Sequence, residues 1–341
     1  MVDLGHILET AVNAVMPIVL VIALGYCLRR SGFLTAEFVK VGSKLGFKCL
    51  LPIMLFINVY NIESFEVIQW DIVLYCMIMV VTLFLLGLVS VRFLTSVRER
   101  RGVILQAVFR SNVAIIGLSL ASALGGSEAV AIASIVTAFT LPILNICAVI
   151  SLTIFVGDAG EKIDIKGILI NIAKNPLIRG ILLGMVCLLV RSFQKQVFGE
   201  VVFALNDDVK FVYTALNNIK SIASPFALLV LGAQFDFSAS KGMLREIIAG
   251  TLWRVVMAPV IAISVAIVLD AVGIISCGIN EFPTLIALFG SPVAVSSAIM
   301  AGQMHNDEQL ATQLVVWTSI ASIATMFLTV CILMATGMLA V

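Results

Sequence analysis

Two short polar clusters interrupt long apolar stretches, and their residue types could form a binding site. The clusters consist of Arg110, Ser111 and Asn112 in one stretch, and of Ser291, Pro292, Ser296 and Ser297 in the other. Proline removes a backbone donor and disfavours the helical conformation in the residue before it. Asparagine also competes with helical backbone hydrogen bonding. We therefore predict a helix interruption at Ser291-Pro292 and a second one at Asn112.

Interrupted helices within a membrane would create an environment suited to an anion. The N-terminus of a half-helix presents free amide groups and the positive end of a dipole, and this combination binds carboxylates and phosphates. Arg110 would add a permanent charge that can hold a carboxylate in bidentate geometry. The alternatives are that Arg110 pairs with carbonyl groups, that Asn112 makes a packing hydrogen bond, and that Ser296 and Ser297 bond back within their helix.

Other kinds of chemistry find little support in the sequence. All twenty Asp and Glu residues lie in predicted loops or near helix ends, which disfavours proton antiport through buried paired carboxylates. The two histidines, His6 and His305, are far apart, and none of the seven cysteines forms a CxxC pair. We therefore expect no enzyme activity, no metal and no cofactor, and we interpret the cysteines as small packing residues.

The composition predicts an all-α integral membrane protein with ten transmembrane helices. Hydrophobic residues make up 61% of the chain and charged residues 12%, whereas soluble domains contain roughly 25% charged residues. The formal net charge of +1 gives no reason to expect a nucleic acid partner. Each spanning helix needs about 20 apolar residues, and the predicted spans are 7–28, 41–60, 69–94, 102–124, 127–155, 176–194, 211–234, 247–270, 282–304 and 308–338.

Lys and Arg in the connections predict the orientation of these helices. They occur after the first, third, fifth and seventh stretches and are absent after the second, fourth and eighth. Arg191 and Lys195, after the sixth stretch, are an exception. Because positive loops remain in the cytoplasm, we expect a multi-pass protein of the cytoplasmic membrane with both termini outside. We interpret the first stretch as a retained helix rather than a signal peptide.

An internal repeat divides the chain into two halves. PIVLVIALG at 17–25 matches PLIRGILLG at 176–184, and FRSNVAI at 109–115 matches FGSPVAV at 289–295. The second match places Asn112 opposite Pro292. Five helices in each half reverse the second half relative to the first, so we predict an inverted repeat, with one half at 1–155 and the other at 156–341.

At these residues the chain resembles the auxin efflux carrier family, a branch of the bile acid, arsenite and riboflavin transporter superfamily. The segments that carry the resemblance are SNVAIIGLSL at 111–120, SPVAVSSAIMAGQ at 291–303, NPLIRGILLG at 175–184 and DEQLATQLVVWTSIASIATM at 307–326. The resemblance covers essentially the whole chain. Its most specific part is the pair formed by the fourth and ninth predicted helices.

The resemblance implies a fold like that of bile acid symporters and sodium–proton antiporters, in which the broken fourth and ninth helices cross. Helices one, two, six and seven would form a scaffold, and the other six a transport domain that moves in an elevator-like manner. A homodimer is also implied. The family's helix-four asparagine contacts the substrate carboxylate, which corresponds to Asn112. Pro292 stands where plant members can have asparagine, and Ser119 replaces the usual helix-four proline.

The leading hypothesis is a secondary transporter that moves a small organic anion across the lipid bilayer by alternating access. Malonate, malate and auxin-like acids remain open as substrates, and so do the coupling ion and the direction of transport. Two alternatives are a membrane sensor of an organic acid without net transport and an ion-coupled exchanger of another solute. A sensor would normally add a soluble output domain, and no stretch here is long and polar enough for one.

Overall fold

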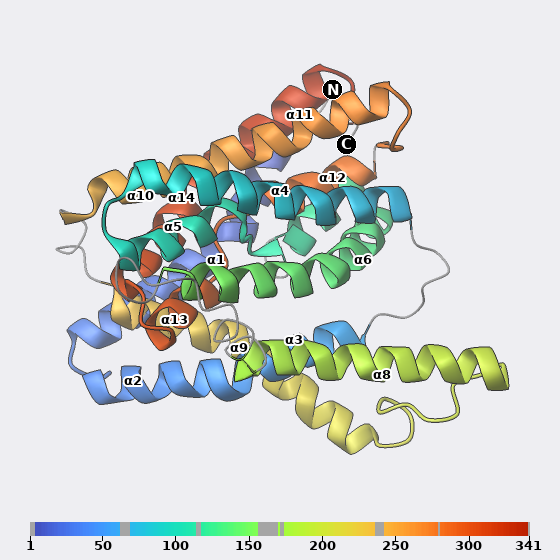
Figure 1. Ribbon diagram of the computed structural model, residues 1–341, viewed down its shortest axis with the longest axis horizontal. Helices are drawn as coiled ribbons and strands as arrows, with labels where there is room; N and C mark the ends of the chain where they lie inside the picture. Colours follow the sequence, from blue (N-terminus) through green and yellow to red (C-terminus); the bar gives the residue numbers. More distant parts are fainter. Residues whose placement is uncertain are drawn as a thin grey trace.

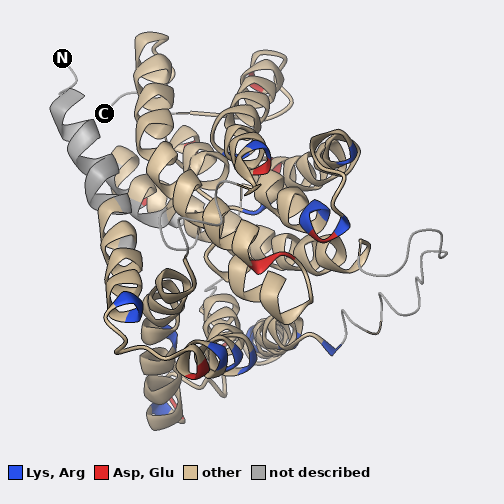
Figure 2. Ribbon diagram, turned by 90° about the vertical axis from the view of Figure 1, so that its left-hand side faces the viewer, with Lys and Arg blue, Asp and Glu red and all other residues tan. Residues whose placement is uncertain are grey.

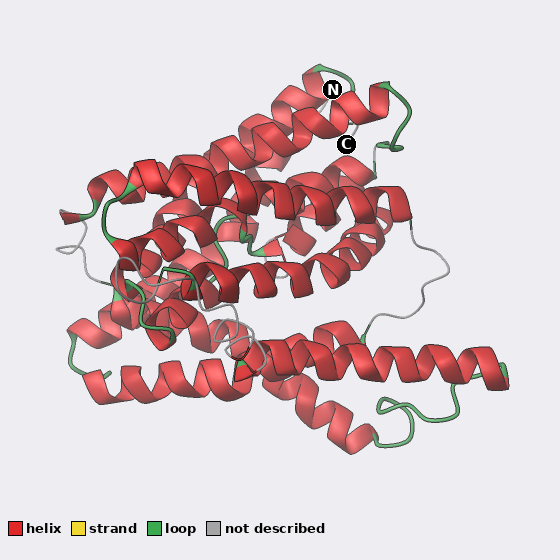
Figure 3. Cartoon of the chain, in the orientation of Figure 1, coloured by secondary structure: helices red, strands yellow, loops and turns green. Residues whose placement is uncertain are grey.

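All regular secondary structure in the described part of the chain is helical (Figure 3). The structure is a computed structural model that describes residues 4–61, 69–113, 117–155, 170, 174–235, 242–278 and 280–339. An isolated antiparallel bridge between Ser111 and Val293 is the one β-type contact within these residues. The prediction of an all-helical chain is confirmed for the described residues.

The helices form two sets along the chain. The first set comprises α1 (Leu4–Arg30), α2 (Ala36–Leu45), η1 (Gly46–Leu50), α3 (Leu51–Tyr60), α4 (Trp70–Leu94), α5 (Arg98–Phe109) and α6 (Leu118–Thr153). The second comprises α8 (Pro176–Phe198), α9 (Lys210–Gln234), α10 (Leu244–Leu252), η4 (Trp253–Met257), α11 (Ala258–Ala271), α12 (Glu281–Leu285), η5 (Ile286–Gly290), α13 (Ser296–Gln303) and α14 (Glu308–Ala335). The η elements are single π-helical turns within longer helices, so α2–η1–α3 and α10–η4–α11 are each continuous.

Seven helical segments of the described residues are long and apolar enough to cross a membrane. They are Ala36–Tyr60, Trp70–Leu94, Glu128–Thr153, Pro176–Phe198, Lys210–Gln234, Leu244–Ala271 and Glu308–Ala335. Each coincides with one of the ten predicted stretches. The remaining three, 7–28, 102–124 and 282–304, contain α1 and two interrupted helices. The count of ten stays a prediction, since the described residues contain seven helices that meet the length and hydropathy of a membrane span.

The predicted gap between 102–124 and 127–155 corresponds to a kink rather than to a loop. Leu118–Thr153 is one helical element, in which Gly126 has φ 62° and ψ −150°. That conformation lies in a region that only glycine adopts readily. The chain therefore bends at Gly126, and the candidate span begins just after it, at Glu128.

Glycines allow two pairs of helices to pack with their backbones in close contact. On α1, Gly25 lies so near the carbonyl oxygen of Leu229 in α9 that no side chain would fit, and Gly232 of α9 meets Ile22 of α1 in the same way. In the other pair, a Cβ on Gly184 of α8 would lie 2.9 Å from the carbonyl oxygen of Phe56 in α3. Small residues at helix contacts are typical of membrane proteins, because close backbone approach maximises packing.

The helices form two groups in space (Figure 1). The helices α2, α3, α8 and α9 lie together along one side, below α4, α5, α6 and α10 in the view of Figure 1. The outer faces of α4 and α8 carry exposed large apolar side chains, including Leu74, Ile78, Phe93, Leu183, Val186 and Phe193. Such a surface suits contact with lipid, because water would not solvate it favourably.

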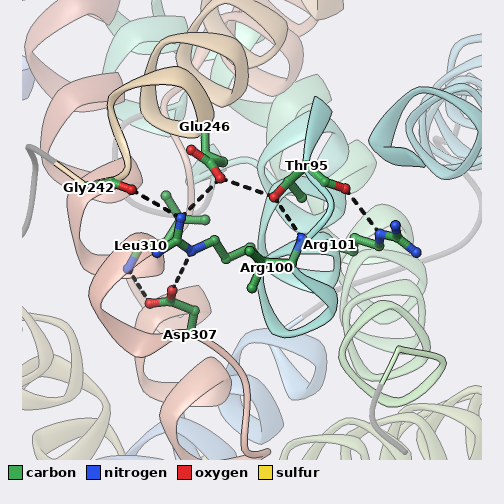
Figure 4. A network of polar contacts seen from close by, with 8 residues as sticks. Thr95, Arg100, Arg101, Gly242, Glu246, Asp307 and Leu310 are labelled. Carbon is green, nitrogen blue, oxygen red and sulfur yellow. Dashed lines mark hydrogen bonds and ion pairs between the residues drawn. The ribbon is translucent and has the colours of Figure 1, made fainter. Parts of the chain in front are cut away.

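One end of the molecule gathers basic residues at helix ends. Figure 2 views the molecule from the side that is on the left in Figure 1, and several Lys and Arg positions there are blue. Arg100 of α5 pairs with Glu246 of α10 at 3.0 Å and with Asp307, the N-cap residue of α14, at 2.9 Å (Figure 4). This network joins the ends of three helices. We call this end, where Lys40 and Lys44 also lie beside Glu308 at the start of α14, the basic end.

Candidate functional site

Two helices are interrupted in the interior of the molecule. The helix α5 ends at Phe109, and Arg110 adopts an extended conformation with φ −86° and ψ 102°. The turn η5 ends at Gly290, Ser291 is extended with φ −62° and ψ 147°, and α13 begins only at Ser296. An extended residue before proline is the expected geometry, so the interruption predicted at Ser291-Pro292 is present. We call 110–112 the first break and 291–295 the second break.

The two breaks satisfy each other's backbone hydrogen bonds. The Asn112 amide donates to the carbonyl oxygen of Pro292 at 2.8 Å, and the Ala294 amide donates to the carbonyl oxygen of Arg110 at 3.3 Å. Between these bonds, Ser111 and Val293 form the antiparallel bridge. In a low-dielectric interior an unpaired backbone group is costly. The breaks therefore stabilise one another. The repeat aligns Asn112 with Pro292, and the backbones of these two residues are hydrogen-bonded to each other.

Side chains of α14 and η4 also form hydrogen bonds with the backbone at the breaks. The Val293 amide donates to Oγ1 of Thr318 in α14 at 3.1 Å. Arg254 of η4 is 0% exposed. It donates to the carbonyl oxygens of Val108 (3.3 Å), Leu288 (3.2 Å) and Ser291 (2.9 Å), as well as to that of Phe289. These carbonyls end α5 and η5, so the guanidinium faces the negative ends of both helices.

A small cavity of about 50 Å³ lies beside the breaks. Its polar lining consists of Arg110, Ser111, Asn112, Asn145, Ser224 and Ser296. Apolar residues form the rest, from α3, α6, α8, α9 and the second break: Leu51, Met54, Leu55, Leu141, Leu144, Leu177, Ala227, Ala294 and Val295. A cavity of this size has room for more than one water molecule. The arrangement of a few polar groups within an apolar wall is typical of small-molecule sites.

Arg110 is the charged group of this cavity, and only neutral groups hold it. The side chain is 3% exposed. Its Nη2 donates to Oδ1 of Asn145 at 2.9 Å and to Oγ of Ser296 at 3.0 Å. Its Nη1 donates to Oε1 of Gln106 at 3.2 Å and to the sulfur of Met300. No carboxylate of the described residues pairs with Arg110. Because a buried charge without a counter-charge is unfavourable, this position favours an anionic ligand.

Polar groups for which the described residues offer no side-chain partner lie next to Arg110. Within the described residues no hydrogen bond involves the side-chain amide of Asn112, which lines the cavity. The Oγ atoms of Ser111 and Ser224 are buried and have no partner in the part of the chain that the structure describes. Buried polar groups are nearly always hydrogen-bonded. A solute or water in the cavity could therefore bind the hydroxyl groups of Ser111 and Ser224.

The predicted site residues divide into two sets. Arg110, Ser111, Asn112 and Ser296 all line the cavity, whereas Ser291, Pro292 and Ser297 do not. The hydroxyl of Ser291 turns back to the carbonyl oxygen of Ala287, and Pro292 contributes its carbonyl oxygen to Asn112. Ser297 has a buried hydroxyl without a partner among the described residues. The side chain of Ser119 lies outside the described residues.

Three polar residues of this region were missing from the prediction. Asn145 and Ser224 line the cavity, and Arg254 supports the breaks. Each lies inside a long apolar stretch, where a polar side chain is rare and tends to face the protein interior. A polar residue within an apolar stretch was therefore the sequence signal that could have identified these three residues. Ser224 has a second signal, because it directly precedes Pro225.

The model of a family described as membrane transport protein matches residues 10–330 of this chain. The matched region includes both breaks and every residue that lines the cavity. No curated protein matches the chain.

Proposed function

Because the chain belongs to the membrane transport protein family, the family of the auxin efflux carriers, we propose that it moves a small organic anion across the membrane by alternating access. It is a multi-pass membrane protein of a transporter family rather than of an enzyme family. The substrate class and the mechanism are our proposal. The observation that carries it is the buried guanidinium of Arg110, which lines a cavity without a carboxylate partner among the described residues.

The substrate carboxylate binds between Arg110 and Asn112 in this proposal. Arg110 supplies the positive charge, and a charge-assisted hydrogen bond to a carboxylate is stronger than its present bonds to neutral acceptors. Asn112 supplies its side-chain amide, while Ser111 and Ser296 contribute hydroxyl groups. Ser291, Pro292 and Ser297 act through the second break, which fixes the position of Asn112 by the 2.8 Å backbone bond. Small carboxylates such as malonate, malate or an auxin-like acid fit this chemistry.

Matched positions in the two halves support an inverted repeat of ten helices. Gly25 and Gly184 lie 159 positions apart, the offset at which the sequences of α1 and α8 match. Both make a close contact with a helix of the other half, Gly25 with α9 and Gly184 with α3. Asn112 and Pro292, which also match, bond to each other. Equivalent residues with equivalent roles are expected of inverted repeats built around a central site.

From the repeat we infer that the protein consists of two parts that move relative to each other. We assign α1, α2–η1–α3, α8 and α9 to a scaffold and the remaining helices, including the crossing broken pair, to a transport domain. The cavity is lined from both groups, by Leu51 and Ser224 of the scaffold and by Arg110 and Asn145 of the transport domain. An elevator-like movement of one group past the other would open it to either side. A homodimer in the cytoplasmic membrane, with both termini outside, completes the proposal.

Uptake into proteoliposomes tests the proposal through Asn112. We expect Asn112→Ala to abolish uptake of the transported acid while the protein still elutes as a folded species from size-exclusion chromatography. The matched control is Asn218→Ala, because Asn218 is an exposed asparagine of α9 outside the cavity. The probes are radiolabelled malonate, malate and indole-3-acetate. Unchanged uptake in Asn112→Ala would contradict the assignment, and saturable binding of an acid without flux would favour a sensor.

A further inference from the structure

A second, larger cavity opens at the basic end of the molecule. Its volume is about 430 Å³. The residues that line it come from α2, α9, α13, the start of α14 and the connection between these last two helices, and they are Ala36, Val39, Lys40, Ser43, Lys44, Gln234, Gly302, Gln303, His305 and Glu308. None of these residues lines the cavity at the breaks.

The same three structural elements line both cavities. The segment α2–η1–α3 reaches from Ser43 at the larger cavity to Leu51 at the smaller one. Likewise, α9 reaches from Gln234 to Ala227, and α13 reaches from Gly302 to Ser296. At about 1.5 Å per helical residue, these intervals correspond to roughly 9–12 Å. The two cavities therefore lie one behind the other along a single interface between helices.

Apolar packing separates the two cavities. In this interval η1 packs against α13, where a Cβ on Gly46 would lie 3.5 Å from Cδ1 of Ile299. Ile299 is 1% exposed, and Phe47 of η1 is also buried. A solute in the larger cavity would therefore have to wait for η1 and α13 to separate before it reached Arg110.

The charges around the larger cavity favour an anion. Lys40 and Lys44 are both exposed, and neither forms a salt bridge within the described residues. Glu308 is the one acidic residue of the lining, so the two lysines leave a net positive charge. A concave surface that bears charge of one sign raises the local concentration of ligands of the other sign.

Gln234 connects the walls of this cavity. Its Nε2 donates to Oγ of Ser43 and to Oε1 of Glu308, both at 2.7 Å, so it joins α9 to α2 and to α14. The Oε1 atom of Gln234 is buried and has no partner among the described residues. This oxygen can accept a hydrogen bond from a water molecule in the cavity.

We propose that the larger cavity is an outer docking site, at which a small carboxylate binds to Lys40 and Lys44 before it moves to the Arg110 site. The inference rests on the proposed function and adds a second binding step to it. The volume of about 430 Å³ admits a carboxylate with part of its hydration shell, whereas the inner cavity of about 50 Å³ requires the solute to shed that water. The lysines attract the hydrated anion over distances up to a Debye length of about 8–10 Å. Selection between solutes follows at Asn112, after the solute has lost its water.

The experiment measures initial uptake rates against substrate concentration in proteoliposomes, with radiolabelled malonate, malate and indole-3-acetate as probes. In Lys40→Gln/Lys44→Gln we expect KM to rise about tenfold with kcat nearly unchanged, because the lysines collect the anion but do not contact it during translocation. The dependence of kcat/KM on ionic strength should also flatten, because fewer charges remain for salt to screen. In Glu308→Gln, which removes the opposing charge at constant shape, KM should fall.

Lys48→Gln is the matched control, because Lys48 is exposed on the neighbouring η1 turn and lines neither cavity. It should keep the wild-type KM and salt dependence. The docking site is overturned if wild-type protein transports an acid while Lys40→Gln/Lys44→Gln retains the KM and salt dependence of Lys48→Gln. Absence of flux for all three acids in wild-type protein would instead overturn the proposed function itself.

Discussion

Arg110 and Arg254 are two buried arginines beside the same breaks, and they are held in different ways. Their exposed fractions are 3% and 0%, and neither pairs with a carboxylate of the described residues. Arg254 donates to four backbone carbonyls, which belong to Val108, Leu288, Phe289 and Ser291. Within the part of the chain that the structure describes, Arg110 donates to side chains alone, which are Gln106, Asn145, Ser296 and Met300.

The type of acceptor determines what each arginine can do. Backbone carbonyls at helix ends cannot turn away, so Arg254 is committed to closing the ends of α5 and η5. An amide or hydroxyl side chain can rotate to another partner, and Arg110 faces a cavity. Arg110 can therefore exchange its neutral acceptors for a carboxylate. Arg254 instead stabilises the helix ends that position Arg110.

Removal of Arg254 should have the largest effect of the changes considered. In Arg254→Met the carbonyls that end two helices lose their donors while they stay buried, and each lost bond of this kind costs about 1.5–3 kcal/mol. We expect the loss of most folded protein, measured as the monodisperse fraction in size-exclusion chromatography and as Tm in detergent. Arg245→Met is the control, because the bond that Arg245 makes among the described residues is to an exposed carbonyl of Phe93. A wild-type Tm in Arg254→Met would contradict the structural role.

Changes at Arg110 should reduce anion binding more than stability. In Arg110→Ala the affinity for the transported acid should fall by about 100-fold, which corresponds to roughly 2.7 kcal/mol, because a charge-assisted bond is lost. Arg110→Lys keeps the charge without the bidentate geometry and should lose less. The measurement is isothermal titration calorimetry. Equal affinities in wild-type protein and both variants would assign a purely structural role to Arg110.

A carboxylate introduced beside Arg110 tests whether Arg110 binds the anionic substrate because it has no negatively charged partner among the described residues. Asn145→Asp keeps the shape of the side chain whose Oδ1 lies 2.9 Å from Nη2 of Arg110. The new ion pair would compete with the substrate and lower its affinity about tenfold or more. Asn145→Ala, which removes the acceptor without adding charge, should lower it less. If Asn145→Asp binds the acid as tightly as wild-type protein does, the charge of Arg110 is not what binds the substrate.

The smallest effect is expected where a single neutral hydrogen bond supports the second break. Thr318→Val keeps the side-chain shape but removes the acceptor of the Val293 amide, at 3.1 Å. The loss should be about 1 kcal/mol of stability, seen as a lowered Tm with Arg110-dependent binding retained. An unchanged Tm would show that the amide finds another acceptor or water.

The local features of this site could be predicted, whereas the contacts between distant segments could not. Ser291-Pro292 and Asn112 disfavour continuous helix through their own chemistry, so the breaks follow from short segments of sequence. The carbonyls around Arg254 come from Val108 and Ser291, which are far apart in the chain. No local pattern indicates that they meet.

The direction of side chains was the second limit. Ser291 was predicted to line the site, but its hydroxyl bonds to Ala287 and points into the preceding turn. Asn145 was missed because one polar residue in an apolar helix does not reveal which way it faces. The helix α5 begins at Arg98 rather than near 102, because its charged first turn has no hydropathy signal and is instead held by the pairs of Arg100 with Glu246 and Asp307.

Uptake of acids compared with that of their uncharged amides tests the central claim most directly. Proteoliposomes would be offered radiolabelled malonate, malate and indole-3-acetate beside malonamide, malamide and indole-3-acetamide. The buried charge of Arg110 predicts saturable uptake of at least one acid, little uptake of its amide, and loss of that preference in Arg110→Ala. Equal uptake of an acid and its amide by wild-type protein would contradict the account.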